Sequence, residues 1–173
     1  MTSKMIKPPA TADLMDVYEA QAIVLPPVMI HFGGHQQFHG PLILIDCFED
    51  NSRIKQVLAT SGLEPQTGQP QVLLVNGYGS LTCALLGDMI AKSAVENQWA
   101  GIIIYGCVRD VAILKTLDLG VLALAAILRK SVRQDRGVLH PSEVVIHNQR
   151  VPANSYVYVD EDGVVILPEP IHV

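Results

Sequence analysis

The chain contains 173 residues, 49% of them hydrophobic and 17% charged. A chain of this length can bury a full core, and we expect a single domain over residues 1–173. Twelve lysines and arginines against seventeen aspartates and glutamates give a formal net charge of −5, without a run of cations. This balance argues against sequence-independent binding of nucleic acid, because phosphate contacts need clustered cations.

The low content of charge also bears on assembly. Ordinary soluble domains carry roughly 25% charged residues, whereas this chain combines its lower fraction with a mean hydropathy of +0.30. We therefore expect apolar surface that one copy leaves uncovered, which is typical of an interface between copies of a chain. The composition predicts a homo-oligomer without fixing the number of subunits.

Cysteine use and hydropathy indicate a cytoplasmic protein. Cys47, Cys83 and Cys107 are odd in number, widely spaced and surrounded by apolar residues, a pattern typical of buried free thiols in a reducing compartment. Residues 1–20 hold no apolar core of signal-peptide length, and no later segment approaches the ~20 apolar residues of a membrane span. We expect no contact with a membrane.

Short apolar segments alternate with turn residues along the chain. Those rich in β-branched residues and bounded by Gly, Pro, Asn or Asp predict strands. They cover residues 41–48, 71–77, 101–106, 120–127, 143–147, 155–160 and 163–168. Segments of helix-forming composition lie at residues 13–21, 51–62, 88–98 and 108–118. The strands in the middle of the chain are apolar on both faces, so we expect layers on both sides of them.

The order of these elements predicts the fold class. A strand, a helix and a strand follow one another from residue 71 to 106, which favours a parallel βαβ unit. After residue 140 only strands are predicted, and the segment DEDG at 160–163 has the composition of a turn between two antiparallel strands. We therefore expect one α/β domain built in layers.

Polar residues gather at one edge of the predicted sheet. The helix that begins near Gly87 and Asp88 would present unpaired N–H groups and the positive end of its dipole to a substrate carboxylate. The amides concerned belong to Gly87, Asp88, Met89 and Ile90. Arg109 and Asp110 follow the strand at 101–106, and in a parallel sheet the strand C-termini and helix N-termini share an edge. Asp88, Arg109 and Asp110 thus predict a site for a cation and an oxyanion.

The same residues also have ordinary structural explanations. Asp88 is a favourable residue at a helix N-terminus, and Arg109 and Asp110 are able to form a salt bridge at a strand end. Spacing alone leaves both interpretations open.

Three other patterns are weaker predictors of chemistry. His31, His35 and His39 recur every four residues, but the glycines among them cost ~1 kcal/mol each in a helix, so a loop is favoured over a zinc site. The segment GYGS at 77–80 lacks the Gly-Lys-Ser/Thr ending of a phosphate loop, which disfavours a nucleotide site. The cysteines have neither a neighbouring histidine nor a CxxC spacing that would favour a catalytic thiol.

Longer stretches carry a resemblance to a known family. They are DLMDVYEA at 13–20, FGGHQQFHGPLILIDCFEDN at 32–51, ALLGDMIAKSAVENQWAGIIIYGCVRD at 84–110, LGVLALAA at 119–126 and DEDGVVILP at 160–168. In these segments the chain resembles the RraA-like family, named after the regulator of ribonuclease E activity A, which includes class II 4-hydroxy-4-methyl-2-oxoglutarate aldolases. The resemblance implies a three-layer β/β/α sandwich of the swivelling-domain type, assembled as a homotrimer with sites at subunit interfaces.

The resemblance also implies a reaction and the roles of residues. Asp88 and, after twenty intervening residues, Arg109-Asp110 match the spacing of the aldolase members. By that analogy Asp110 holds magnesium or manganese partly through waters, and Arg109 contacts the C2 oxygen of a 2-oxo acid. The stretch from Gly87 to Ile90 binds the acid, and Asp88 orients a metal-bound water for proton transfer. The implied enzyme is a lyase that cleaves 4-hydroxy-4-methyl-2-oxoglutarate to two pyruvates and decarboxylates oxaloacetate through the same pyruvate enolate.

An alternative remains within the same resemblance: a non-catalytic regulator that binds and inhibits ribonuclease E. A protein-binding module has no physical need for Asp88 and Asp110, so their presence favours the enzyme. The chain departs from the family pattern at Asn154-Ser155, where many members have Gly-Asp. It also has Ile113 where some aldolases carry an acidic residue, a departure that bears on metal affinity.

Overall fold

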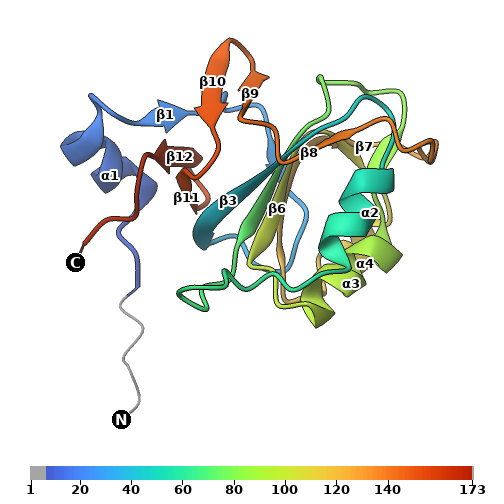
Figure 1. Ribbon diagram of the computed structural model, residues 1–173, viewed down its shortest axis with the longest axis horizontal. Coiled ribbons are helices and arrows are strands. Elements are labelled where there is room, and N and C mark those ends of the chain that lie inside the picture. Colours follow the sequence, from blue (N-terminus) through green and yellow to red (C-terminus); the bar gives the residue numbers. More distant parts are fainter. Residues whose placement is uncertain (1–6, 173) are drawn as a thin grey trace.

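The computed structural model describes residues 7–172, which form two β-layers and one layer of helices (Figure 1). The central layer is built on four parallel strands, in the order β3 (Phe38–Asp46), β4 (Val72–Asn76), β6 (Gly101–Val108) and β7 (Gly120–Ala126). Three short strands extend it: β2 (Ile30–His31) beside β7, β5 (Ala84–Leu86) beside β6, and β8 (Val138–Leu139) beside β3. The parallel pairing predicted between 71–77 and 101–106 is confirmed.

Helices cover one face of this central sheet. They are α2 (Ser52–Leu58), α3 (Asp88–Glu96) and the single turn α4 (Val111–Leu114). Because side chains alternate along a strand, every second residue faces these helices, and Val75, Ile102 and Ile104 pack with them in one buried cluster. None of the helices within residues 7–172 is long and apolar enough to cross a membrane.

The other face of the central sheet packs on a second β-layer. Strand β3 belongs to both layers, since residues 38–41 pair antiparallel with β11 (Tyr156–Val159) and residues 42–46 pair with β4. The layer continues through β12 (Val164–Leu167) to β1 (Ile23–Val24), and the hairpin of β9 (Glu143–Ile146) and β10 (Gln149–Pro152) packs into the same core. The expected β/β/α sandwich is therefore confirmed.

The observed elements correct several predicted boundaries. Each predicted strand overlaps an observed strand, and β11 and β12 form the antiparallel pair expected around 160–163. The helix predicted at 51–62 ends at Leu58, and α1 (Thr11–Tyr18) begins before the predicted 13–21. The helix predicted at 108–118 shrinks to α4, because Asp110 takes a left-handed conformation that a right-handed helix cannot include.

Five short strands are absent from the sequence predictions: β1, β2, β5, β8 and β10. They contain two to four residues each, too few for alternation to be recognised in the sequence. Strand β5 matters most for function, because it leads directly into α3 and lies beside the end of β6.

Candidate active site

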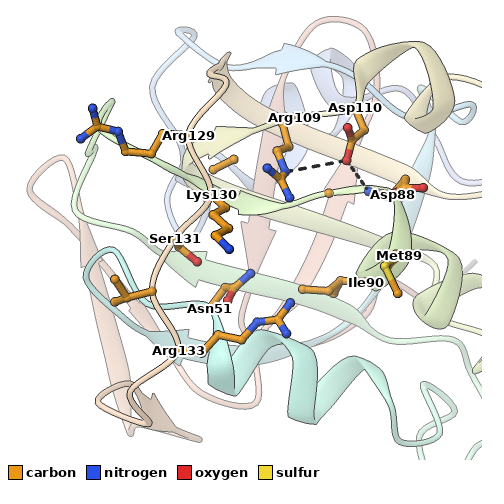
Figure 2. A pocket seen from close by; sticks show the side chains of 13 residues that line it. Asn51, Asp88, Met89, Ile90, Arg109, Asp110, Arg129, Lys130, Ser131 and Arg133 are labelled. Carbon is orange, nitrogen blue, oxygen red and sulfur yellow. Dashed lines mark hydrogen bonds and ion pairs between the residues drawn. The ribbon is translucent and has the colours of Figure 1, made fainter.

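A pocket of about 650 Å³ opens at the carboxyl edge of the central sheet, where β6 ends and α3 begins (Figure 2). All residues predicted for the site line this pocket: Gly87, Asp88, Met89, Ile90, Arg109 and Asp110. Strand β6 positions Arg109 and Asp110, which follow its last residue. Strand β5 runs parallel to β6 and positions the start of α3, so both groups reach the same edge.

The carboxylate of Asp110 caps the N-terminus of α3. Its Oδ2 accepts a hydrogen bond of 3.1 Å from the backbone amide of Asp88 and lies 3.9 Å from Nε of Arg109. Gly87 permits this approach, because a Cβ at that position would lie 2.8 Å from Oδ2. Asp110 has φ 59 and ψ 40, a left-handed conformation that Asp tolerates better than most residues. This turn aims the carboxylate back at the positive end of the helix dipole.

Because Asp110 caps α3, fewer of the predicted backbone amides are free to bind a substrate. The amide of Asp88 is used by Asp110, whereas those of Met89 and Ile90 lie in the first turn, where the helix itself offers no acceptor. A substrate carboxylate at this end of the pocket would therefore bind fewer amides than the sequence predicts, and would lie beside the carboxylate of Asp110.

Asp88 is the first residue of α3, and Gly87 is its N-cap. The carboxylate of Asp88 lies 3.2 Å from Nζ of Lys92, one turn further along the helix. The hydrogen bond from Lys92 lowers the pKa of Asp88, so this carboxylate is ionised at neutral pH. Figure 2 shows the side chain directed away from Arg109. The structure thus places Asp88 at the edge of the pocket and not against Arg109.

Arg109 is half-exposed and extends into the pocket (Figure 2). Its backbone amide donates a 2.9 Å hydrogen bond to the carbonyl of Leu86, which fixes the end of β6 against β5. Within residues 7–172 its ion pair is the one with Asp110, at 3.9 Å through Nε. This pair leaves the remaining guanidinium N–H groups for an oxyanion in the pocket.

Three further cations line the pocket and are missing from the sequence predictions. Arg129, Lys130 and Arg133 come from the segment that follows β7. Together with Arg109 they place four cations against the two carboxylates of Asp88 and Asp110, although the whole chain carries a net charge of −5. The signal was present as three cations within five residues after a predicted strand. The sequence holds no long run of lysine and arginine, yet the fold gathers these four cations in one pocket.

Backbone hydrogen bonds hold this cationic segment, residues 129–133, in place. The carbonyl of Arg129 accepts a 2.8 Å hydrogen bond from the amide of Ala84, and Val132 exchanges hydrogen bonds of 3.3 Å with Glu49 and Asn51. The segment is therefore fixed to β5 on one side and to the loop before α2 on the other.

The buried carboxylate of Asp50 fixes the chain just beyond this segment. It accepts hydrogen bonds of 2.9 Å from the amide of Gln134 and 3.3 Å from that of Arg136. The hydroxyl and amide of Ser52 donate to its other oxygen. Asp50 is fully buried, so these donors replace its hydration and set the course of residues 134–136.

The donor set suits a loosely held magnesium or manganese ion. No group of three or more His, Cys, Asp or Glu that could hold a metal occurs in the part of the chain that the structure describes. Magnesium is usually held through one or two carboxylates and keeps several waters. Asp110 supplies one carboxylate, whose Oδ2 accepts the hydrogen bond from the amide of Asp88. The residues present therefore fit such an ion at Asp110 and do not resemble a zinc site.

The remaining sequence motifs lie away from this pocket. His31 and His39 contact the carbonyl of Asp160 and the hydroxyl of Tyr156, respectively. Ile113, one of the departures from the family pattern, is partly exposed on α4 and does not line the pocket. Ser155, the other departure, donates its hydroxyl to the carbonyl of Pro152 within the second β-layer.

Comparisons with known proteins bear on this arrangement. A family model described as Aldolase/RraA matches residues 11–166. The chain belongs to the RraA-like family. A protein of Pseudomonas fluorescens (strain Pf0-1), provisionally named 4-hydroxy-4-methyl-2-oxoglutarate aldolase, is 42% identical over 161 residues, covering 93% of this chain and 94% of the relative. A relative of the same provisional name from Hahella chejuensis is 40% identical with the same coverage.

Solved structures share the fold of this RraA-like chain. The RNA-processing inhibitor RraA from Thermus thermophilis superposes with a TM-score of 0.88 at 38% identity, covering 95% of this chain and 96% of that one. A structure described as S-adenosylmethionine: 2-dimethylmenaquinone methyltransferase from Geobacillus kaustophilus HTA426 gives 0.87 at 34% identity, covering 94% and 97%. The names given to these relatives differ in activity, so the shared fold does not by itself assign one of these activities to this chain.

The contacts of Asp50 predict how stability depends on pH. Burial alone would raise the pKa of Asp50, but hydrogen bonds from Ser52, Gln134 and Arg136 outweigh it and lower the pKa from 3.8 to about 2. The stabilisation is therefore complete above pH 3.8 and is lost as the pH falls toward 2. We expect Asp50→Asn to lower the free energy of unfolding on the order of 2 kcal/mol at neutral pH, with a gap that shrinks in acid.

Urea titrations followed by the fluorescence of Trp99 measure this gap at several pH values. Asp135→Asn provides the control, because Asp135 is exposed and lies close to the same loop. A gap that stays constant between pH 6 and pH 2.5 would contradict the assigned contacts of Asp50.

Proposed function

We propose that this RraA-like protein is a metal-dependent lyase that cleaves 4-hydroxy-4-methyl-2-oxoglutarate to two pyruvates and also decarboxylates oxaloacetate. The observation that carries the proposal is the placement of Arg109 and Asp110 together at the N-terminus of α3, inside a pocket rich in cations. Both substrates are 2-oxo dicarboxylates and suit such a pocket by charge. The names of the Pseudomonas relatives support the aldolase reaction.

The proposed reaction breaks the C3–C4 bond and moves its electron pair to the C2 oxygen. The amides of Met89 and Ile90 bind the C1 carboxylate at the helix terminus. Arg109 donates hydrogen bonds to the C2 oxygen, where negative charge develops as the pyruvate enolate forms. When bound, a magnesium or manganese ion held by Asp110 supplies positive charge that polarises the C2 carbonyl.

Proton transfer completes the cleavage. The 4-hydroxyl group loses its proton as C4 becomes the carbonyl of one pyruvate, and C3 of the enolate gains a proton to give the other. Asp88 serves this step in the proposal, because it is an ionised carboxylate at the edge of the pocket. Its carboxylate faces Lys92 at the edge of the pocket, so in this proposal Asp88 transfers protons there and does not contact the C2 oxygen.

The first test is a direct assay. We expect the purified protein with magnesium or manganese to convert oxaloacetate to pyruvate faster than the metal alone, because Arg109 stabilises the enolate. Pyruvate formation is measured with a metal-only control and after addition of EDTA. A rate equal to that of the metal-only control would exclude the proposed lyase.

Two substitutions separate the roles of Arg109 and Asp110. Arg109→Ala removes a donor to the developing oxyanion, so we expect kcat to fall by ~10²–10³. Asp110→Ala is expected to weaken metal binding, and high metal concentration should restore part of its activity. Arg150→Ala, which removes an exposed arginine of β10, serves as the control. An Arg109→Ala enzyme within about threefold of wild type, ~0.6 kcal/mol, would contradict the assigned role.

A regulatory role is the second function that an observation favours. The Thermus protein described as an RNA-processing inhibitor matches this chain over nearly its full length. A chain of that kind would bind ribonuclease E through its surface and would not need the pocket. Inhibition of ribonuclease E that is unchanged in Arg109→Ala would support this function beside or instead of the lyase.

We also propose a cytoplasmic homotrimer. The cysteines Cys47, Cys83 and Cys107 are free and buried, as expected in a reducing compartment. Around the pocket, the side chains of Met89 and Val132 are exposed, and Leu128 beside it is 93% exposed. Such apolar groups at the edge of a pocket suit a contact with another copy.

Light scattering tests the assembly. We expect a mass of three times the 18.8 kDa of one chain at micromolar concentration. Leu128→Asp places a charge in the expected interface and should lower that mass, whereas Val28→Asp changes an exposed side chain that does not line the pocket and should not. A monomeric mass with full activity would overturn the assembly.

A further inference from the structure

A second hollow, of about 460 Å³, lies beside α2, and none of its residues lines the active-site pocket. The N-cap of α2, Asn51, lines the active-site pocket, whereas Gln56 and Val57 in the last turn line the second hollow. The two hollows therefore lie toward opposite ends of α2. We call the second one the apolar cleft, because most of its wall comes from six apolar residues: Ile43, Val57, Leu63, Pro65, Trp99 and Leu139.

Fixed contacts shape the apolar cleft. The indole N–H of Trp99 donates a 3.0 Å hydrogen bond to the carbonyl of Thr60. The same ring packs on Gly62, where a Cβ would lie 2.6 Å from it. These contacts lock Trp99 to the segment that follows α2. A cleft that is already formed costs little ordering of the protein when something binds in it.

Strand β8 borders the apolar cleft and has one free edge. It pairs with β3 on one side, and in the described part of the chain no strand pairs with its other side. The amide of His140 donates a 3.2 Å hydrogen bond to the carbonyl of Leu44. Because bonded and non-bonded pairs alternate in an antiparallel ladder, the N–H and C=O of Leu139 point away from β3. The side chain of Leu139 lines the cleft, so a chain extended along this edge would lie beside the cleft.

A cation lies at the start of this edge. Arg53 of α2 donates hydrogen bonds of 3.1 Å to the carbonyl of Gly137 and 3.0 Å to Oε1 of Gln56. Since Gln56 lines the cleft and Gly137 precedes β8, the guanidinium lies between the cleft and the strand. The exposed carboxylate of Asp135, 3.7 Å from Arg53, balances this charge only in part, because such surface pairs are weak.

A second copy of the same edge is a poor partner for β8. Pairing two β8 strands around a two-fold axis would bring Arg53 and Arg136 of both copies together. The side chain of Arg136 is 56% exposed, and the carboxylate that faces it at 3.6 Å, Asp50, is fully buried. Like charges on paired strands are destabilising, so the edge favours a partner with acidic side chains.

We propose that the apolar cleft and the free edge of β8 bind an extended acidic peptide segment of another protein. The main chain of the peptide pairs with Leu139, one large apolar side chain enters the cleft, and an adjacent acidic side chain contacts Arg53. The edge is two residues long, so the main chain forms few hydrogen bonds and the cleft supplies most of the affinity. This binding site is independent of the proposed lyase reaction.

Selection of random dodecapeptides displayed on phage, with the purified protein as the target, tests the proposal. We expect the selected sequences to combine a large apolar residue with Asp or Glu. Fluorescence anisotropy then measures the affinity of the same peptides, synthesised with a fluorescein label. Ser61→Phe places a ring in the cleft and should weaken binding at least about tenfold, because the apolar side chain of the peptide stays exposed. Arg53→Met should weaken it about threefold.

Two matched controls accompany these variants. Gln66→Phe adds the same ring to an exposed residue of the same loop that does not line the cleft. Arg150→Met removes an exposed arginine of β10 that pairs with Glu143. Both should bind the peptides as wild type does, and circular dichroism melting verifies that every variant is folded.

Hydrogen exchange measured by NMR tests the pairing of strands. We expect a bound peptide to slow exchange of the Leu139 amide, because that N–H points to the free edge. A peptide that binds through its side chains alone leaves this amide unprotected.

The remaining outcomes overturn the proposal. They are the absence of any selected peptide that Ser61→Phe weakens, the selection of basic sequences, and unchanged exchange at Leu139. A light-scattering mass that falls in Ser61→Phe but not in Gln66→Phe assigns the cleft to a contact between copies and rejects the peptide. Saturable binding of anilinonaphthalene sulfonate in the cleft, without any selected peptide, assigns it to a small apolar ligand and rejects the peptide as well.

Discussion

The fold depends on β3 being shared by two sheets. Its first residues, 38–41, pair with β11, and the rest pair with β4, so one continuous strand fixes the second β-layer to the central sheet. Phe38 lies at the start of this strand, and its ring packs on Gly101 and Gly120, where any side chain would collide with it. The starts of β6 and β7 are therefore set by contact with the other layer, and their carboxyl ends are presented together at the opposite edge.

The pocket lies at the carboxyl edge of the central sheet, where the parallel strands end. A sheet of parallel strands collects the ends of β5 and β6 in one place, and the start of α3 comes with them. Asp110 then completes the arrangement by turning through a left-handed conformation onto the helix terminus. A single carboxylate thereby serves as a helix cap and as the ligand proposed for the metal, which couples the local structure to the proposed chemistry.

Charge is distributed unevenly in this molecule. The chain as a whole is acidic, yet its pocket carries Arg109, Arg129, Lys130 and Arg133 around only two carboxylates. Such a local excess attracts a small dianion while the rest of the surface repels polyanions. An acidic protein of this kind is unsuited to nucleic acid over most of its surface and still suited to a small acidic substrate in its pocket. The buried carboxylate of Asp50 helps to keep these cations in place, since its hydrogen bonds fix the chain that follows the cationic segment.

The sequence by itself predicted the longer strands, the layered α/β class, and the placement of Asp88, Arg109 and Asp110 at one edge of the sheet, because apolar periodicity and the order of elements are local properties. Tertiary structure decided what depends on distant segments. Sequence spacing could not show that Asp110 caps α3, that Asp88 faces Lys92, or that residues 129–133 line the pocket. Nor could it show that Asn51 makes no side-chain hydrogen bond to its own helix, because the packing around a buried side chain is set by segments distant in the chain.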